Sequence, residues 1–397
     1  MNNVTVTAIR CFIQLLFFVS IFSLSASKAD SAELNVSEID IALGMENYDF
    51  QPFFNQFTAE TGIKVNILAF NNNQLKSELV LYAETAQLPD AVIVPSDYLG
   101  LTELDYSSVP QRWYKPDISN HILQSAQVKG VPKGIPIMYG NHLVLYYNST
   151  LIERPFTDLQ LFLQLPHKQP VLGWNYYEMY WFASLVNAQQ NALINNAQPQ
   201  LDTRAMRLAI SNYQTLYNSG AIDPNCAYQC LMAKFSNAEL PYFVNGIWAY
   251  QHLKHKLQDD LAISPLPLWG TQRLTSFASS HVLAFPSQAL STETRSALKL
   301  LAEFMQSDKV QDALWQELGT LPVRETSLAL LLDSSDPHLL ALISALTYTT
   351  PLPNDPIMAY VWEAMLKGVT RYLAGVYGVE KTTKYMQFII NKSIKND

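Results

Sequence analysis

Two acidic residues directly after predicted strands could carry chemistry. Glu46 follows the strand predicted over residues 39–43, and Asp97 follows the buried-type strand predicted over residues 91–94. Two carboxylates on one wall of a cleft are the pair that glycosidases use as acid and base. The same groups could instead accept hydrogen bonds from the hydroxyl edge of a bound ligand. A third interpretation of Asp97, or of Ser96 beside it, is a plain helix N-cap.

Motifs of the common enzyme classes are missing from the sequence. It contains no G-x-G-x-x-G, no phosphate loop, no H-E-x-x-H and no G-x-S-x-G. His252 and His255 stand at i, i+3, but Lys254 and Lys256 flank them, which favours a solvated helix face over a metal site. We therefore expect no catalytic residue, no cofactor and no metal.

Charge and composition favour a small-molecule ligand. The formal net charge is −8 and Lys/Arg clusters are few, whereas nucleic-acid binding needs a basic face. Aromatic residues make up 12% of the chain, with 21 Tyr and 7 Trp. Most of them will be core, but such a supply also suits a pocket for flat, partly apolar ligands.

The first segment predicts export. Arg10 precedes the uncharged run Cys11–Ala26, and Ser27-Lys28-Ala29 fits a small-x-small cleavage pattern. The run is shorter than the roughly 20 residues of a membrane span, although an uncleaved N-terminal anchor is the alternative. We expect residues 1–29 to be a signal peptide that is cleaved near Ala29, and the mature protein to be periplasmic.

Cys226 and Cys230 are the cysteines that remain after this cleavage. In an oxidising compartment two such close cysteines are a disulfide candidate. On a regular helix, however, i and i+4 Cβ atoms lie ~5–6 Å apart, beyond the ~3.5–4.5 Å of a disulfide. The preceding Asp223-Pro224-Asn225 indicates a turn, which would remove the conflict. No histidine or further cysteine stands at zinc-ligand spacing.

Strand and helix signals alternate through the first third of the mature chain. Strands are predicted over 39–43, 63–68 and 91–94, with helices over 50–57 and 74–86 between them. This order predicts parallel βαβ units. Ligands of an open parallel sheet bind beyond the carboxyl ends of its strands, where the acidic residues stand.

The rest of the chain predicts a second lobe. Roughly 365 mature residues favour two domains over one, and strand-rich segments flank a long middle region rich in Gln, Asn, Tyr and Trp. A chain that crosses between two lobes more than once would give this pattern. The predicted elements are strands at 134–139, 143–147 and 281–285, and helices near 176–190, 202–218, 291–306 and 308–318, with further helices to the end.

Four segments carry a resemblance to a known family. In their order and spacing they resemble the maltodextrin-binding family of periplasmic solute-binding proteins, the family 1 extracellular binding proteins. The resemblance continues through Gly319–Arg324 and Pro353–Trp362, so it covers essentially the whole mature chain. The four segments are Phe57–Val65, Pro89–Tyr98, Gly134–Pro136 leading to Leu143–Asn148, and Phe243–Tyr250.

This resemblance implies an α/β fold of the two-lobe periplasmic-binding-protein type, type II-like, with a ligand cleft between the lobes and hinge strands crossing. The N-terminal lobe is expected from 33–141 plus 283–345, and the C-terminal lobe from 142–282 plus 346–397. Members close on their ligand and present the closed form to an inner-membrane ABC permease. We therefore expect a monomeric, non-enzymatic binding protein for a di- or oligosaccharide.

The resemblance also implies binding residues. Trp248 matches the cleft-wall tryptophan of an N-G-x-W-A segment, although a tryptophan at helical spacing is more often core. Trp362 matches an aromatic residue that stacks on a sugar ring. Asp97 matches the acidic residue after the P-D strand. Other matches are a polar residue after the first strand and an aromatic platform in the second lobe, namely Glu46 or Asn47, and Tyr176 and Tyr177.

The chain departs from the maltodextrin pattern at two places, so the particular sugar stays open. Tyr139-Gly140-Asn141 stands where that subfamily has an acidic residue, and residues 276–280 replace a glycine-rich stretch. We place Tyr139, Asn141 and Ser279 at the site. The run Val-Pro-Ser-Asp-Tyr also resembles polyamine-binding relatives, but a polyamine site should gather several carboxylates near aromatic rings. A polyamine or other small solute is therefore the alternative ligand, and a secreted glycosidase-like enzyme the alternative activity.

Overall fold

The computed structural model describes residues 36–44, 48–70, 72–190, 192–195, 197–286, 290 and 294–396. The predicted signal peptide and the candidates Glu46 and Asn47 lie outside these residues. Residues 35–397 form one compact unit. Within the described part of the chain, no helix combines the length and the apolar character needed to cross a membrane.

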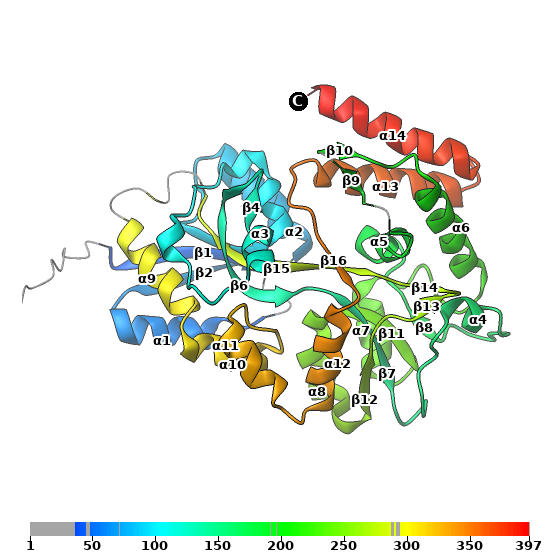
Figure 1. The fold of residues 1–397 in the computed structure, drawn as a ribbon, viewed down its shortest axis with the longest axis horizontal. Coiled ribbons are helices and arrows are strands. Elements are labelled where there is room, and N and C mark those ends of the chain that lie inside the picture. The colour runs from blue at the N-terminus through cyan, green and yellow to red at the C-terminus, as the bar shows by residue number, and fades with distance from the viewer. Residues whose placement is uncertain are drawn as a thin grey trace, which may run out of the picture. The chain divides into compact units, whose positions relative to one another are not determined.

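A six-stranded sheet is built from the predicted βαβ units (Figure 1). The central strand β1 pairs in parallel with β2 on one side and β3 on the other, which confirms the alternation seen in the sequence. Helix α1 buries Phe53, Phe54 and Phe57, and ends at Gly62, whose φ of 77° is the left-handed conformation that glycine adopts most easily. These elements are β1 (Glu38–Gly44), α1 (Gln51–Thr61), β2 (Lys64–Phe70), α2 (Asn72–Glu84) and β3 (Ala91–Pro95). We call the part built on this sheet the first lobe.

Strand β15 (Ser276–Ala284) belongs to this sheet and reaches two hydrophobic cores. Its residues 281–284 pair antiparallel with β3, and residues 279–284 pair with β6 (Gly134–Gly140). Its beginning, residues 276–278, pairs in parallel with β16 (Thr349–Pro351). Phe277 packs in a different core from Leu283. The strand therefore starts in one hydrophobic core and ends in another, as Figure 1 shows across the middle of the molecule.

A four-stranded sheet forms the second lobe. Its order is β12-β7-β11-β8, in which β7 pairs antiparallel with both β12 and β11. Helix α5 is buried on nearly every side, because it packs against α6 and also against β15. Helix α12 packs against β12, although its residues 337–345 were expected with the first lobe. The elements are β7 (Leu143–Asn148), β8 (Leu172–Gly173), α5 (Met179–Asn187), α6 (Arg204–Asn218), α7 (Tyr228–Ser236), β11 (Tyr242–Gly246), α8 (Tyr250–Leu257), β12 (Leu261–Ser264) and α12 (Pro337–Leu346).

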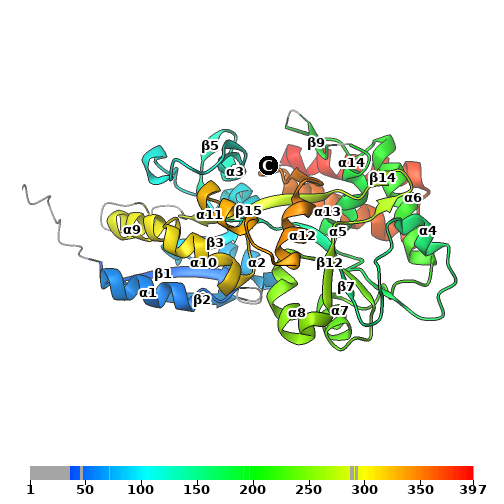
Figure 2. The same ribbon diagram turned by 60° about the horizontal axis from the view of Figure 1, so that its bottom comes forward.

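The remaining helices cover the two sheets. Helices α13 and α14 lie side by side in both views, and α14 also contacts α6 (Figures 1 and 2). The other α-helices are α3 (Asn120–Ser125), α4 (Leu159–Leu163), α9 (Arg295–Met305), α10 (Asp308–Leu318), α11 (Glu325–Leu332), α13 (Met358–Leu373) and α14 (Val379–Asn396). Short strand pairs are β4 (Gln127–Val128) with β5 (Val131–Pro132), β9 (Ile194–Asn195) with β10 (Gln198–Pro199), and β13 (Leu268–Trp269) with β14 (Gln272–Arg273).

Candidate functional site

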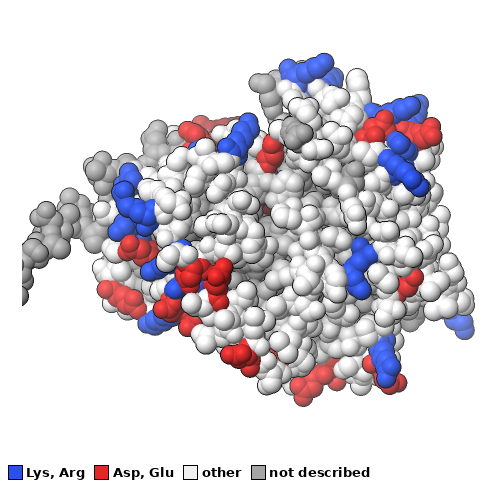
Figure 3. Space-filling view, viewed as in Figure 1, with Lys and Arg blue, Asp and Glu red and all other residues white. Residues whose placement is uncertain are grey.

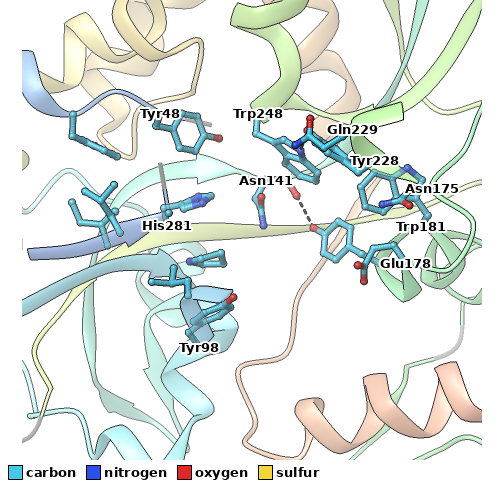
Figure 4. Close-up of a pocket in the computed structure, with 17 residues that line it drawn as sticks. Tyr48, Tyr98, Asn141, Asn175, Glu178, Trp181, Tyr228, Gln229, Trp248 and His281 are labelled. Atoms are coloured by element: carbon cyan, nitrogen blue, oxygen red, sulfur yellow. Dashed lines mark hydrogen bonds between the residues drawn. The ribbon is translucent and has the colours of Figure 1, made fainter. Parts of the chain in front are cut away.

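A cavity of about 270 Å³ lies beyond the carboxyl ends of β1 and β3, where they face α5 and the start of α7 (Figure 4). This is the edge at which open parallel sheets bind ligands. The two walls come from the two lobes. Figure 4 shows the first-lobe side chains Tyr48, Tyr98 and His281 across from the second-lobe side chains Asn175, Glu178, Trp181, Tyr228, Gln229 and Trp248, with Asn141 between the two groups.

Four rings of the second lobe, which we call the cleft cluster, line this cavity: Tyr180, Trp181, Tyr228 and Trp248. They meet edge to face. The ring planes of Trp181 and Trp248 make an angle of 79° at 6.0 Å, and those of Tyr180 and Trp248 make 67° at 6.2 Å. Edge-to-face contacts leave more ring face uncovered than flat stacking does. The partly buried rings of Tyr180, Tyr228 and Trp248 therefore keep part of their faces open to the cavity, whereas Trp181 is buried and supports them.

Trp248 is held on two sides. Its Nε1 donates a hydrogen bond to the hydroxyl of Tyr228 at 3.0 Å. Its ring lies directly over Gly246, where an added Cβ would stand 2.0 Å from ring atom Cζ3. Since φ of Gly246 is −81°, this glycine is needed for the close approach of the ring and not for its backbone conformation. The glycine in the N-G-x-W-A segment thus makes room for the tryptophan.

Tyr180 connects the cavity to the segments that cross between the sheets. Its hydroxyl proton is shared between two backbone carbonyls, that of Asn141, between β6 and β7, and that of Phe277 in β15. Asn141 has a φ of 45°, and its Nδ2 donates to Ser279 Oγ at 2.9 Å. Ser279 is buried and supports Asn141, so it reaches the cavity only through this partner.

A second chamber of about 280 Å³ adjoins the first and shares Tyr98, Glu178 and Tyr180 with it. Asp97, Lys76 and Trp362 complete its polar and aromatic lining. Because the two chambers share lining residues, they form one continuous cleft that runs from Trp248 to Trp362.

Burial sets the charges along this cleft. It raises the pKa of Asp97 to about 6, against the smaller lowering effects of a backbone hydrogen bond and of Lys76. It also lowers the pKa of His281 to about 4, so this imidazole is neutral at pH 7. Figure 3 shows that the middle of the face seen in Figure 1 carries few charged side chains. The first chamber thus offers mainly neutral polar groups.

Four of the predicted residues line the cleft. Asn141 and Trp248 line the first chamber, and Asp97 and Trp362 line the second. Residues 96–100 form a 3₁₀ helix without a side-chain cap, so Asp97 is not the N-cap that the sequence also allowed.

Three other predicted residues lie elsewhere. Tyr176 is buried and stacks on Tyr213 with ring centroids 4.1 Å apart. Tyr177 is exposed and does not line either chamber. The ring of Tyr139 packs beside His121, because Tyr139 pairs with Leu321 at the outer side of β6.

Sequence reasoning missed most of the first-lobe wall and three of the four rings of the cleft cluster, all but Trp248. Tyr48 falls just beyond the segment after β1 that was singled out, and Tyr98 directly follows Asp97. His281 stands in β15 directly before the apolar residues 282–284. Tyr48 and Tyr98 had a signal in their positions shortly after strand ends. Tyr228 and Gln229 had one in the two cysteines that flank them.

Cys226 and Cys230 form a disulfide, with Cα atoms 5.3 Å apart. Helix α7 begins at Tyr228, after Cys226, so the two cysteines do not share a regular helix. The turn expected before them is present, since the Cys226 N–H donates to the Asp223 carbonyl. Among the described residues, no group of three or more His, Cys, Asp or Glu side chains could hold a metal ion.

Comparisons with known proteins agree with this architecture. The family model for bacterial extracellular solute-binding proteins matches residues 53–341, more than half of the chain. Among solved structures, the chain is similar to the maltose/maltodextrin-binding domain MalE from Bdellovibrio bacteriovorus bound to maltotriose. The TM-score is 0.80 at 20% sequence identity, and the match covers 90% of this chain and 100% of that one. A search of curated protein sequences finds no significant match.

Proposed function

The chain belongs to the family of bacterial extracellular solute-binding proteins, and we propose that its cleft binds a neutral di- or oligosaccharide for an ABC importer. Family and fold are those of binding proteins that work in the periplasm or outside the cell. The proposal includes a signal peptide cleaved near Ala29, a monomeric mature protein and an inner-membrane permease as partner.

The observation that carries this proposal is the cleft cluster. Pyranose rings present apolar C–H faces that pack on indole and phenol rings, while their hydroxyl edges need donors and acceptors. Four rings in edge-to-face contact supply the faces. Asn141, Asn175, Gln229 and neutral His281 supply uncharged hydrogen-bonding groups in the same chamber.

Two further features support a ligand of more than one sugar ring. The second chamber extends the cleft to Trp362, so an aromatic side chain is present at each end. The structurally similar MalE domain is bound to maltotriose, a trisaccharide.

The lobes would close over this ligand by a hinge motion. We propose 33–141 plus 281–336 for the first lobe and 142–280 plus 337–397 for the second, because α12 packs on β12 and residues 281–284 pair with β3. The hinge would lie at Gly140-Asn141-His142, between β6 and β7 of the two sheets, and in β15, whose two ends pack in different hydrophobic cores.

A thermal-shift panel at two salt concentrations tests the function. A ligand at a hundred times its dissociation constant stabilises the folded state by ~2.7 kcal/mol, which is a shift of several degrees for a protein of this size. Malto-, cello- and fructo-oligosaccharides, trehalose and sucrose are compared with spermidine and putrescine. We expect a shift with at least one di- or oligosaccharide that is the same at 0.1 M and 1 M salt.

The polyamine alternative has the opposite salt dependence. Attraction between partly exposed charges weakens as the screening length falls from ~10 Å at 0.1 M salt to ~3 Å at 1 M. A melting-temperature shift with spermidine that disappears at high salt would overturn the sugar proposal. Asp97 and Glu178 would then be the charged partners of the polyamine. Intact sugar recovered after incubation would argue against the glycosidase alternative.

A further inference from the structure

The disulfide encloses two residues of the cavity wall. Tyr228 and Gln229 stand between Cys226 and Cys230, and both line the first chamber. Figure 4 shows their side chains beside Trp248 on the second-lobe wall. The five-residue loop closed by the disulfide is therefore part of the binding surface.

Tyr228 links this loop to the central ring of the cleft cluster. Its hydroxyl accepts the hydrogen bond from Trp248 Nε1 at 3.0 Å, and its ring contacts Trp181 edge to face at 6.5 Å. Among the described residues, Trp248 Nε1 has no other hydrogen-bond acceptor. A shift of Tyr228 would leave the Trp248 ring without the bond that sets its orientation.

The start of α7 lacks the usual means of fixing a helix end. Ala227 is its N-cap and provides no side-chain hydrogen bond, and the first turn holds no acidic residue. Tyr228, as the first residue of this helix, is at the position where fraying begins. The disulfide joins the residue before the cap to the first turn, and so constrains this end of the helix covalently.

Global stability is a weaker reason for a disulfide that closes so short a loop. In the chain-entropy account, the constraint on the unfolded chain decreases as the closed loop becomes shorter. A loop of five residues gains about two thirds of what a loop of fifteen gains in this way. The loop does, however, restrict the few backbone angles that place Tyr228 and Gln229.

We propose that the Cys226–Cys230 disulfide is a positioning element for ligand binding, which holds the Tyr228 hydroxyl where it orients the Trp248 ring. The inference rests on the proposed function, since it concerns the same cleft. It assigns Tyr228 as the residue through which the disulfide acts.

Reduction of the folded protein tests the proposal, because Cys230 is exposed to solvent. Maltotriose affinity is measured by calorimetry before and after treatment with a phosphine reductant, in the wild type and in Tyr228→Phe. Tyr228→Phe keeps the ring and removes the acceptor hydroxyl. A typical hydrogen bond corresponds to roughly three- to tenfold in affinity. Reduction should weaken wild-type binding by this factor, and Tyr228→Phe binding by less than twofold.

The matched control is Lys234→Ala. It breaks the ion pair of Lys234 with Asp223, 3.7 Å, which also ties α7 to the preceding turn but does not touch the cavity. We expect unchanged maltotriose affinity. An equal loss on reduction in wild type and Tyr228→Phe, or no loss in either, would overturn the proposal.

Tryptophan fluorescence without ligand separates this inference from the proposed function. Reduction and Tyr228→Phe should shift the emission in the same direction, and the two changes together should give no more than either alone. If the oxidised protein does not bind maltotriose, the proposed function fails for that sugar, and this emission experiment still decides the inference. Additive shifts, or no shift on reduction, would contradict it.

Discussion

Two aromatic clusters of the second lobe pack in opposite ways. In the core cluster, Tyr176 and Tyr213 stack flat, with ring planes 6° apart, and each hydroxyl donates to the backbone carbonyl of the other residue. Phe182 packs edge to face against this stack, at 65° to the Tyr213 ring, and all three residues are buried; in the cleft cluster only Trp181 is buried. In the cleft cluster the rings meet edge to face, and the Tyr180 hydroxyl bonds to the crossing segments.

The difference shows how one helix serves two purposes. Helix α5 contributes Phe182 to the core cluster and Tyr180 and Trp181 to the cleft cluster. Flat stacking with reciprocal hydrogen bonds uses ring faces and hydroxyls within the protein. Edge-to-face packing keeps faces available to a ligand. The core cluster should therefore contribute to stability, and the cleft cluster to binding.

The largest effect is expected from Tyr213→Ala. Removing a buried ring leaves a cavity, and the free energy of unfolding should fall by ~3–5 kcal/mol, as measured by urea denaturation. Ligand affinity of the folded protein should stay unchanged. Tyr213→Phe is the matched control, since it keeps the stack and removes one hydrogen bond, at a cost of about 1 kcal/mol. A stable Tyr213→Ala protein that no longer binds would reverse the roles of the two clusters.

Trp248→Ala should give the complementary result. Loss of a central aromatic contact weakens binding by at least ~2 kcal/mol, whereas the melting temperature should fall less than for Tyr213→Ala, because Trp248 is only partly buried. Calorimetric titration and thermal melting separate the two effects. Trp248→Phe should retain part of the affinity, since a flat ring remains. Normal binding with a large loss of stability would place Trp248 in the core.

Gly246→Ala tests the support of the same ring without removing it. The new Cβ would stand 2.0 Å from the Trp248 ring and force it to move, at a cost of about 1–3 kcal/mol. We expect the loss to appear in affinity as well as in stability. Gly378→Ala serves as the control, because its Cβ would meet no atom within 4 Å. Unchanged affinity for Gly246→Ala would show that the orientation of Trp248 does not matter.

The smallest effect concerns Asp97, whose ionised carboxylate in the cleft should lower the stability of the ligand-free protein. The folded-state pKa of Asp97 lies near 6, above its ordinary value of 3.8. The folded protein therefore holds this proton more tightly, and ligand-free stability decreases as the pH rises from about 4 through 6. Asp97→Asn removes this decrease and should be about 1–2 kcal/mol more stable at pH 7, since one pKa unit corresponds to about 1.4 kcal/mol.

Urea denaturation of the ligand-free proteins at pH 4 and pH 7 measures this difference. At pH 4 the two proteins should be similar, because Asp97 is then protonated in the folded state. Ligand affinity of Asp97→Asn should fall at pH 7, because the carboxylate accepts hydrogen bonds more strongly than an amide does. Parallel pH profiles of wild type and variant would refute the assignment.

Local patterns predicted the elements well. The phenylalanines of α1 at i, i+3, i+4 and i+7, ended by Gly62, and the short apolar strand β3 correspond to the structure. The apolar residues that define α1 and β3 are close in sequence and, in α1, lie on one face. Hydrophobic periodicity is therefore enough to predict both elements.

The site was harder to predict, because α5 is apolar on almost every side. Hydrophobic periodicity then does not distinguish the face toward the core from the face toward the cleft. The helix was predicted from residue 176, which would place Tyr176 and Tyr180 on one face, but it begins at Met179. Tyr176 lies in the preceding turn and points toward α6, where it meets Tyr213. Trp248 was predicted from the N-G-x-W-A motif, so its prediction did not depend on where α5 begins.

A crystal structure with the sugar that gives the largest thermal shift tests the account most directly. The account predicts a pyranose ring packed on the face of Trp248, with hydroxyl groups hydrogen-bonded to Asn141, Asn175 or Gln229, and the stack of Tyr176 on Tyr213 unchanged. A sugar bound away from the cleft cluster, or one that inserts between Tyr176 and Tyr213, would contradict it.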